Sequence, residues 1–120
     1  MRKHELVDDA LWTRLQPLLP VFQPSPLGGP KRRISDRQAL NGILFVLRAG
    51  IAWDELPLSL GYGTGMTCWR RLQIWKNAGV WPKVELLLEV EFRFRQQIDF
   101  DRSFQELPPR RRTRRRPRLD

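Results

Sequence analysis

The segment from residue 36 to residue 49, DRQALNGILFVLRA, most constrains what this chain can fold into. Ser35 or Asp36 can cap its N-terminus, and Gly50 directly follows its last turn, so that both ends of a helix are marked. A helix this apolar is expected to be central to the core of a small domain. Its apolar residues recur at helical spacing and cover a broad face: Leu40, Ile43, Leu44, Phe45, Val46 and Leu47.

Three further segments place apolar residues at helical spacing, and no segment has convincing strand-like alternation. Asp8 or Asp9 can cap the first of these helices, and Pro17 lies in its last turn, where it can stop or bend the helix. The predicted fold class is therefore all-α, a small four-helix domain. The predicted helices span residues 9–19, 36–49, 64–79 and 81–97.

Two connections separate these helices. Residues 20–34 contain four prolines, two glycines and a Lys-Arg-Arg cluster, and are expected to form an irregular loop. Residues 51–57, IAWDELP, are expected to form a short turn whose Trp53 and Leu56 fill the core. The order helix, glycine-containing turn, helix resembles a helix-turn-helix module, but 51–63 is longer than its usual turn. The sequence leaves open a divergent variant or a superficial similarity.

The helix predicted at 64–79 has two different sides, and Thr64 or Thr67 can cap it. The core side is expected to hold Met66, Trp69, Leu72 and Trp75. The other side is expected to hold Thr67, Arg70, Arg71, Ile74 and Asn77, flanked by Gln73 and Lys76. Arginine can bind guanine edges, Asn and Gln match adenine, and Lys neutralises phosphate. The spacing fits a DNA-facing helix, and it also fits a face that is merely solvated.

The net charge of +9 favours an acidic polymer or an anionic surface as partner. Residues 1–98 carry +5 of this charge and residues 99–120 carry +4, so the body and the tail are both basic. No signal peptide or apolar run of ~20 residues is present, so a protein of the bacterial cytoplasm without a membrane partner is expected.

Catalytic and metal chemistry find little support in the sequence. Cys68 is the one cysteine and His4 the one histidine, so they cannot build a thiolate metal cluster or a disulfide. We expect Cys68 to be a small core residue. The segment GYGTGM lacks the lysine of a phosphate-binding loop, and no strand precedes it. No cofactor, metal or small-molecule substrate is therefore expected.

Residues 33–81 closely resemble the N-terminal domain of insertion-sequence transposases of the insertion-sequence-five family, from RISDRQALNGILFVLRAG through TCWRRLQIW to GVW. LVDDALWTRLQPLLP resembles the opening helix of the same domain, so the similarity covers roughly residues 5–100. Asp54 and Glu55 stand where the family usually has Arg-Asp. The resemblance implies a domain that binds the terminal inverted repeats of the mobile element.

The same resemblance implies that a catalytic domain follows, in which an Asp-Asp-Glu triad holds two divalent metal ions. Glu106 falls by counting at the place of the first catalytic Asp but lacks its flanking residues, so the role is not carried over. We expect residues 1–98 to be the DNA-binding domain and 99–120 a disordered basic tail. The change near Gln105 suggests either a frameshift, as in family members encoded in two overlapping frames, or decay of the gene.

The sequence thus predicts a DNA-binding part of a transposase that is not an enzyme by itself. The alternative is a protein-interaction module that pairs with full-length transposase, or with a second copy, through residues 81–97. The residues expected to contact DNA are Lys31, Arg32, Arg33, Thr67, Arg70, Arg71, Gln73, Lys76 and Asn77.

Overall fold

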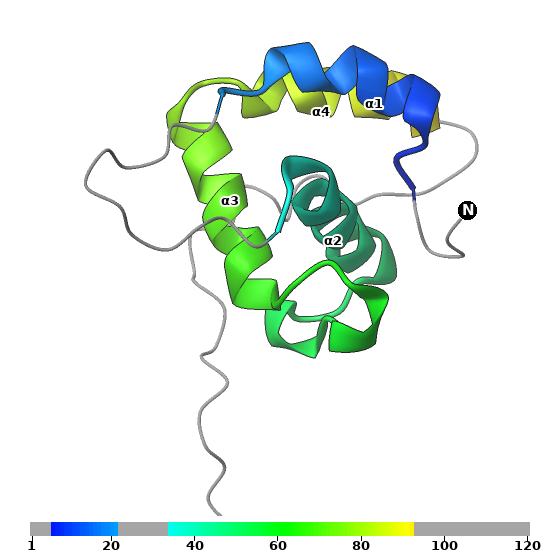
Figure 1. Ribbon diagram of the computed structural model, residues 1–120, viewed down its shortest axis with the longest axis vertical. Coiled ribbons are helices and arrows are strands. Elements are labelled where there is room, and N and C mark those ends of the chain that lie inside the picture. Colours follow the sequence, from blue (N-terminus) through cyan, green and yellow to red (C-terminus); the bar gives the residue numbers. More distant parts are fainter. Residues whose placement is uncertain (1–5, 22–33, 93–120) are drawn as a thin grey trace, which may run out of the picture.

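The computed structural model describes residues 6–21 and 34–92, and these residues form helices without any strand. The all-α prediction is confirmed for this part of the chain. In Figure 1, α2 lies at the centre with α3 along one side, and α1 and α4 lie across one end. The elements in order are α1 (Asp9–Leu15), η1 (Gln16–Leu18), α2 (Asp36–Ala49), η2 (Trp53–Glu55), η3 (Leu58–Leu60), α3 (Gly65–Asn77) and α4 (Trp81–Phe92).

Local side-chain caps explain where the long helices begin. The Asp8 carboxylate accepts from the backbone N–H of Leu11 at the start of α1. Ser35, one of the two residues predicted to cap α2, forms a reciprocal capping box with Gln38. Helix α2 stops at Gly50, whose left-handed backbone (φ 71°) closes the last turn.

The first helix is shorter than predicted. The α-helical part ends at Leu15, and residues 16–18 continue as a turn of 3₁₀ helix instead of α-helix to residue 19. Pro17 explains the change, because it has no N–H to donate and its ring crowds the preceding turn. Helix α4 is described to Phe92, and the predicted extension to residue 97 lies outside the described residues.

The core is formed by apolar faces of all four α-helices around α2. Trp53 and Leu56, which belong to the turn that connects α2 and α3, are buried in the core, as the sequence predicts. The rings of Trp75 and Trp81 stack with centroids 6.3 Å apart, which joins the end of α3 to the start of α4. The fully buried side chains include Val7, Leu15, Leu40, Ile43, Leu44, Val46, Leu47, Leu72, Trp75, Trp81 and Leu88.

Two glycines let α3 approach its neighbours closely. A Cβ on Gly42 of α2 would lie 2.5 Å from the Cys68 Sγ of α3. A Cβ on Gly65, the first residue of α3, would overlap the carbonyl oxygen of Trp53. Both contacts require the absence of a side chain, and they fix α3 against α2 and η2.

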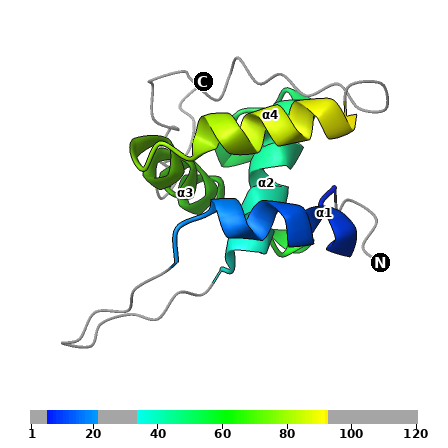
Figure 2. The ribbon, with the colours of Figure 1, turned by 90° about the horizontal axis from the view of Figure 1, so that it is seen from above.

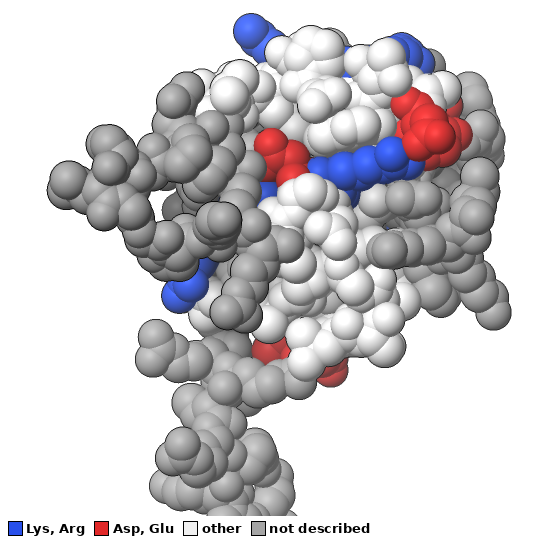
Figure 3. Space-filling model, viewed as in Figure 1, with Lys and Arg blue, Asp and Glu red and all other residues white. Residues whose placement is uncertain are grey.

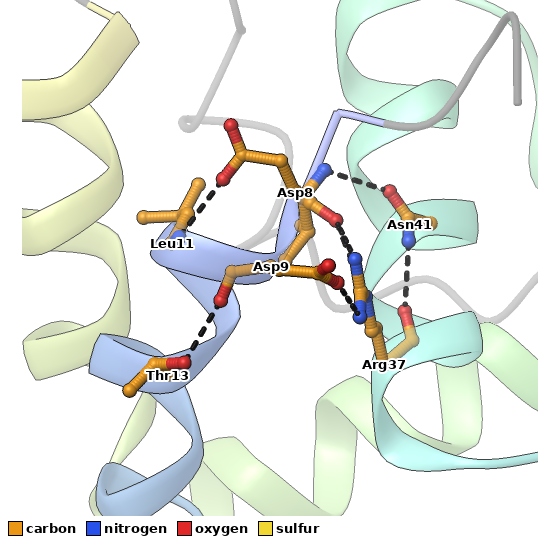
Figure 4. Close-up of polar contacts among 7 residues, drawn as sticks. Asp8, Asp9, Leu11, Thr13, Arg37 and Asn41 are labelled. Atoms are coloured by element: carbon orange, nitrogen blue, oxygen red, sulfur yellow. Dashed lines mark hydrogen bonds and ion pairs between the residues drawn. The ribbon is translucent and has the colours of Figure 1, made fainter. Parts of the chain in front are cut away.

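Polar contacts join the segment before α1 to α2 (Figure 4). The Asn41 amide oxygen accepts from the backbone N–H groups of Leu6 and Val7, at 2.9 and 3.0 Å. Arg37 donates twice to the Val7 carbonyl and pairs with Asp9 at 2.8 Å. Asn41 is 1% exposed, so these bonds give partners to its buried amide oxygen and to the backbone N–H groups that precede α1. Seen from above, α1 and α4 both cross over α2 (Figure 2). The two helices are linked by an ion pair, in which Arg14 Nη1 lies 3.4 Å from Glu91 Oε1.

Candidate nucleic-acid interface

The N-terminus of α3 is capped by Thr64, one of the two threonines predicted for this role. The Thr64 hydroxyl oxygen accepts from the Thr67 backbone N–H at 3.0 Å, and its O–H donates to the Thr67 hydroxyl at 3.0 Å. Thr67 therefore lies half-buried in the first turn, where it supports the cap. The helix then continues for 13 residues to Asn77, two residues before the predicted end at Gly79.

The outward side of α3 carries Arg70, Ile74 and Asn77, all exposed. These positions are spaced by four and three residues, so their side chains lie next to one another on one face of the helix. Ile74 is 51% exposed, although it is apolar. We call these three residues the outer stripe. A guanidinium, an apolar group and an amide in one row can reach three different kinds of base edge.

Arg71 does not lie on this side, so the prediction that it faces outward beside Arg70 is wrong. The residue is 6% exposed. Its Nη1 donates to Asp36 Oδ1 and its Nη2 to the carbonyl oxygen of Ile34, both at 3.0 Å. A helix advances by about 100° per residue, which turns position 71 toward the side of Cys68 and Trp75. A charged side chain is usually expected to be exposed to solvent. Here the Asp36 carboxylate and the Ile34 carbonyl accept the hydrogen bonds that water would otherwise accept, so Arg71 can be buried.

The predicted core side of α3 needs the same correction. Leu72 and Trp75 are buried and Trp69 packs half-buried against the core, as expected, but Met66 is only half-buried and is not part of the core. A spacing of three residues drifts around a helix, so that positions 66 and 75 lie about 180° apart and cannot share one side. The buried side instead follows a spacing of three and four residues: Gly65, Cys68, Arg71, Leu72 and Trp75.

Two further residues predicted to contact DNA lie beside the outer stripe rather than on it. Gln73 and Lys76 are both half-buried. The Gln73 Nε2 has no hydrogen-bond partner within the described part of the chain and is shielded from solvent. The amide therefore does not present its donor group at the surface of α3. Asn77 remains exposed one turn further along the helix.

The cluster Lys31, Arg32 and Arg33 lies outside the described residues. Its covalent neighbour Ile34 is described, and it lies against α3. The Arg71 guanidinium holds the Ile34 carbonyl, and the Ile34 side chain packs so close to Gly63 that a Cβ there would lie 2.9 Å from Ile34 Cγ1. The chain therefore enters α2 beside α3.

Cys68 is a buried core residue, as the sequence predicts. Burial raises the pKa of its thiol to about 12, although the positive charge of Arg71 opposes this shift. The thiol lies 3.3 Å from the Tyr62 carbonyl oxygen, to which it can donate. A neutral, buried thiol is unreactive toward electrophiles at neutral pH.

The positive charge of the protein is concentrated outside the described helices. Residues 6–21 and 34–92 hold seven Lys and Arg against eight Asp and Glu, a net charge of −1. Residues 1–5, 22–33 and 93–120 hold 15 Lys and Arg against five acidic residues, a net charge of +10. In the view of Figure 3, basic and acidic side chains lie side by side in one band. The helical part therefore carries no excess of positive charge.

Within residues 6–21 and 34–92, no group of three or more His, Cys, Asp or Glu side chains is arranged to hold a metal ion. No helix in those ranges has the length and apolar character needed to cross a membrane.

Comparison with known proteins agrees with the resemblance seen in the sequence. Residues 7–85 match a protein family described as "Putative transposase of IS4/5 family". A relative from Burkholderia cepacia, "Insertion element IS402 uncharacterized 16.2 kDa protein", is 48% identical over 99 residues, which cover 82% of this chain and 67% of the relative. No solved structure matches the chain. The chain therefore belongs to the family of transposase-related proteins of IS4/5 insertion elements.

Proposed function

We propose that the chain binds DNA through the outer stripe of α3 and recognises the terminal inverted repeats of an insertion element. The observation that carries the proposal is the row of exposed Arg70, Ile74 and Asn77 on a capped helix whose opposite side is fixed to the core. Family membership supports DNA as the partner. The helix-turn-helix arrangement stays a prediction, because 15 residues with two 3₁₀ turns separate α2 from α3.

In this proposal the other predicted contacts have separate roles. Arg71 positions α3 through Asp36 and Ile34 and does not read a base, since a base contact would break both bonds. Lys31, Arg32 and Arg33 bind phosphates, and Lys76 and Thr67 support the edge of the outer stripe. The protein acts in the bacterial cytoplasm, without a cofactor, and does not catalyse strand transfer by itself.

The charge distribution gives the proposal a quantitative form. Because the described helices carry a net charge of −1, most phosphate neutralisation is assigned to the basic flanking residues. Such contacts are independent of sequence and weaken steeply with salt. The outer stripe supplies the discrimination between sequences, which depends on contacts to base edges.

The test is a titration of labelled duplex carrying the element's terminal repeat against scrambled duplex, at two salt concentrations. A variant of the whole 120-residue chain, in which the six arginines of residues 110–116 are changed to Gln, separates phosphate binding from sequence discrimination. We expect this variant to bind both duplexes more weakly but to keep its preference for the repeat. If this variant bound the terminal-repeat and scrambled duplexes equally, α3 would not be the element that recognises the sequence.

The alternative function is pairing with full-length transposase through α4. Leu86 and Val90 favour it, because they are 66% and 61% exposed and lie four residues apart on this helix. This function predicts that the chain shows no preference between the terminal-repeat and scrambled duplexes in the titration. Sedimentation of the chain mixed with full-length transposase would show a complex that Leu86→Glu prevents.

A further inference from the structure

Ile74 is an exposed large apolar residue in the middle of an otherwise polar row. The described residues expose four others of this kind, none of which belongs to α3: Val21, Leu58, Leu86 and Val90. The core does not account for Ile74, because Leu72 and Trp75 already fill the buried side of the helix and half of the Ile74 side chain is open to solvent. The exposed half of this side chain is available for an apolar contact at the surface of α3.

The neighbours of Ile74 indicate what that surface meets. Arg70 lies one turn before it and Asn77 one turn after it, on the same face. At 1.5 Å per residue, the row from position 70 to position 77 is about 10 Å long, which is about three base-pair steps of 3.4 Å. A helix fits into the major groove, where Arg matches guanine and Asn matches adenine.

The major groove offers one apolar group on its base edges, the C5 methyl of thymine. We propose that Ile74 contacts a thymine methyl in the sequence that the chain recognises, between the base contacts of Arg70 and Asn77. The inference rests on the proposed function and adds a specificity determinant that the polar residues cannot supply. Shielding one methyl group from water corresponds to about a fourfold change in Kd, or ~0.8 kcal/mol.

Replacement of thymine by deoxyuridine tests this contact, because it removes the C5 methyl and leaves base pairing unchanged. Each thymine of the terminal-repeat duplex is replaced singly, and the Kd of the full-length protein is measured for each duplex. We expect about a fourfold loss of affinity at one position. For Ile74→Ala, the thymine and deoxyuridine duplexes should bind equally at that position, whereas Ile74→Val should keep part of the difference.

Leu86→Ala is the matched control, since Leu86 is similarly exposed but lies on α4. It should keep the full thymine–deoxyuridine difference. If the repeat is preferred but no position responds to deoxyuridine, or if Ile74→Ala keeps the response, the inference alone is overturned. Equal affinity for repeat and scrambled duplexes would overturn the proposed function and this inference with it.

Discussion

The inner and outer sides of α3 place two consecutive arginines in opposite environments. Arg71 is 6% exposed and held by Asp36 and Ile34, whereas Arg70 is exposed. The inner side joins α3 to α2 by close packing and by an ion pair with little access to water. The outer side can therefore change its chemistry without disturbing the fold. This separation lets a small domain hold a helix rigidly and still present a variable surface.

The largest expected effect lies at the start of the inner side. In Gly65→Ala the new methyl group would overlap the Trp53 carbonyl, so η2 and α3 would have to move apart. We expect a loss of about 3 kcal/mol in the free energy of unfolding, measured by urea denaturation. Asn77→Ala, on the outer side, should change it by less than about 0.5 kcal/mol. Equal stability of the two variants would mean that α3 does not start against η2.

The two arginines give the sharpest comparison of the sides. Arg71→Ala removes two charge-assisted hydrogen bonds and leaves the Asp36 carboxylate, whose side chain is 19% exposed, without this partner. We expect a loss of about 2–3 kcal/mol in stability. Arg70→Ala is the matched control and should lose less than about 0.5 kcal/mol. The contrast between inner and outer sides fails if both variants unfold at the same urea concentration.

A smaller effect concerns the pH dependence of stability. The pKa of Cys68 is raised from 9.0 to about 12 by burial, so above pH 9 the unfolded chain loses this proton while the folded chain keeps it. Stability should therefore fall as the pH rises from about 9 to about 12. Between pH 8 and pH 10 we expect wild type to lose about 1 kcal/mol more than Cys68→Ala. Parallel curves for the two proteins would show that the thiol is not buried in solution.

Much of the fold follows from local patterns in the sequence. Ser35, Thr64 and Gly50 mark helix ends because a cap depends on residues within one turn of the helix. The burial of Trp53 and Leu56 follows from large apolar side chains in a short turn between two helices. The end of α1 was less predictable, because Pro17 can be accommodated by either a bent α-helix or the 3₁₀ turn that the structure contains.

The candidate site was predictable only in part. The exposure of Arg70 and Asn77 agrees with the predicted outer side of the helix. The burial of Arg71 depends on Asp36, 35 residues earlier, and no local pattern reveals a partner at that distance. A signal was nevertheless present, because a strict 3.6-residue period places position 71 between Cys68 and Trp75. The importance of Ile74 follows from its 51% exposure in the folded structure, which the sequence pattern does not provide.

The central claim is that the outer stripe reads DNA sequence, and Arg70→Ala tests it most directly. The Kd values for terminal-repeat and scrambled duplexes are measured with the full-length wild type, Arg70→Ala and Arg48→Ala, which removes an exposed arginine from the end of α2. We predict that Arg70→Ala reduces the preference for the repeat by about 5- to 150-fold, the 1–3 kcal/mol of one bidentate contact, whereas Arg48→Ala leaves the preference unchanged. An undiminished preference in Arg70→Ala, or an equal loss in both variants, would contradict the assignment of sequence recognition to α3.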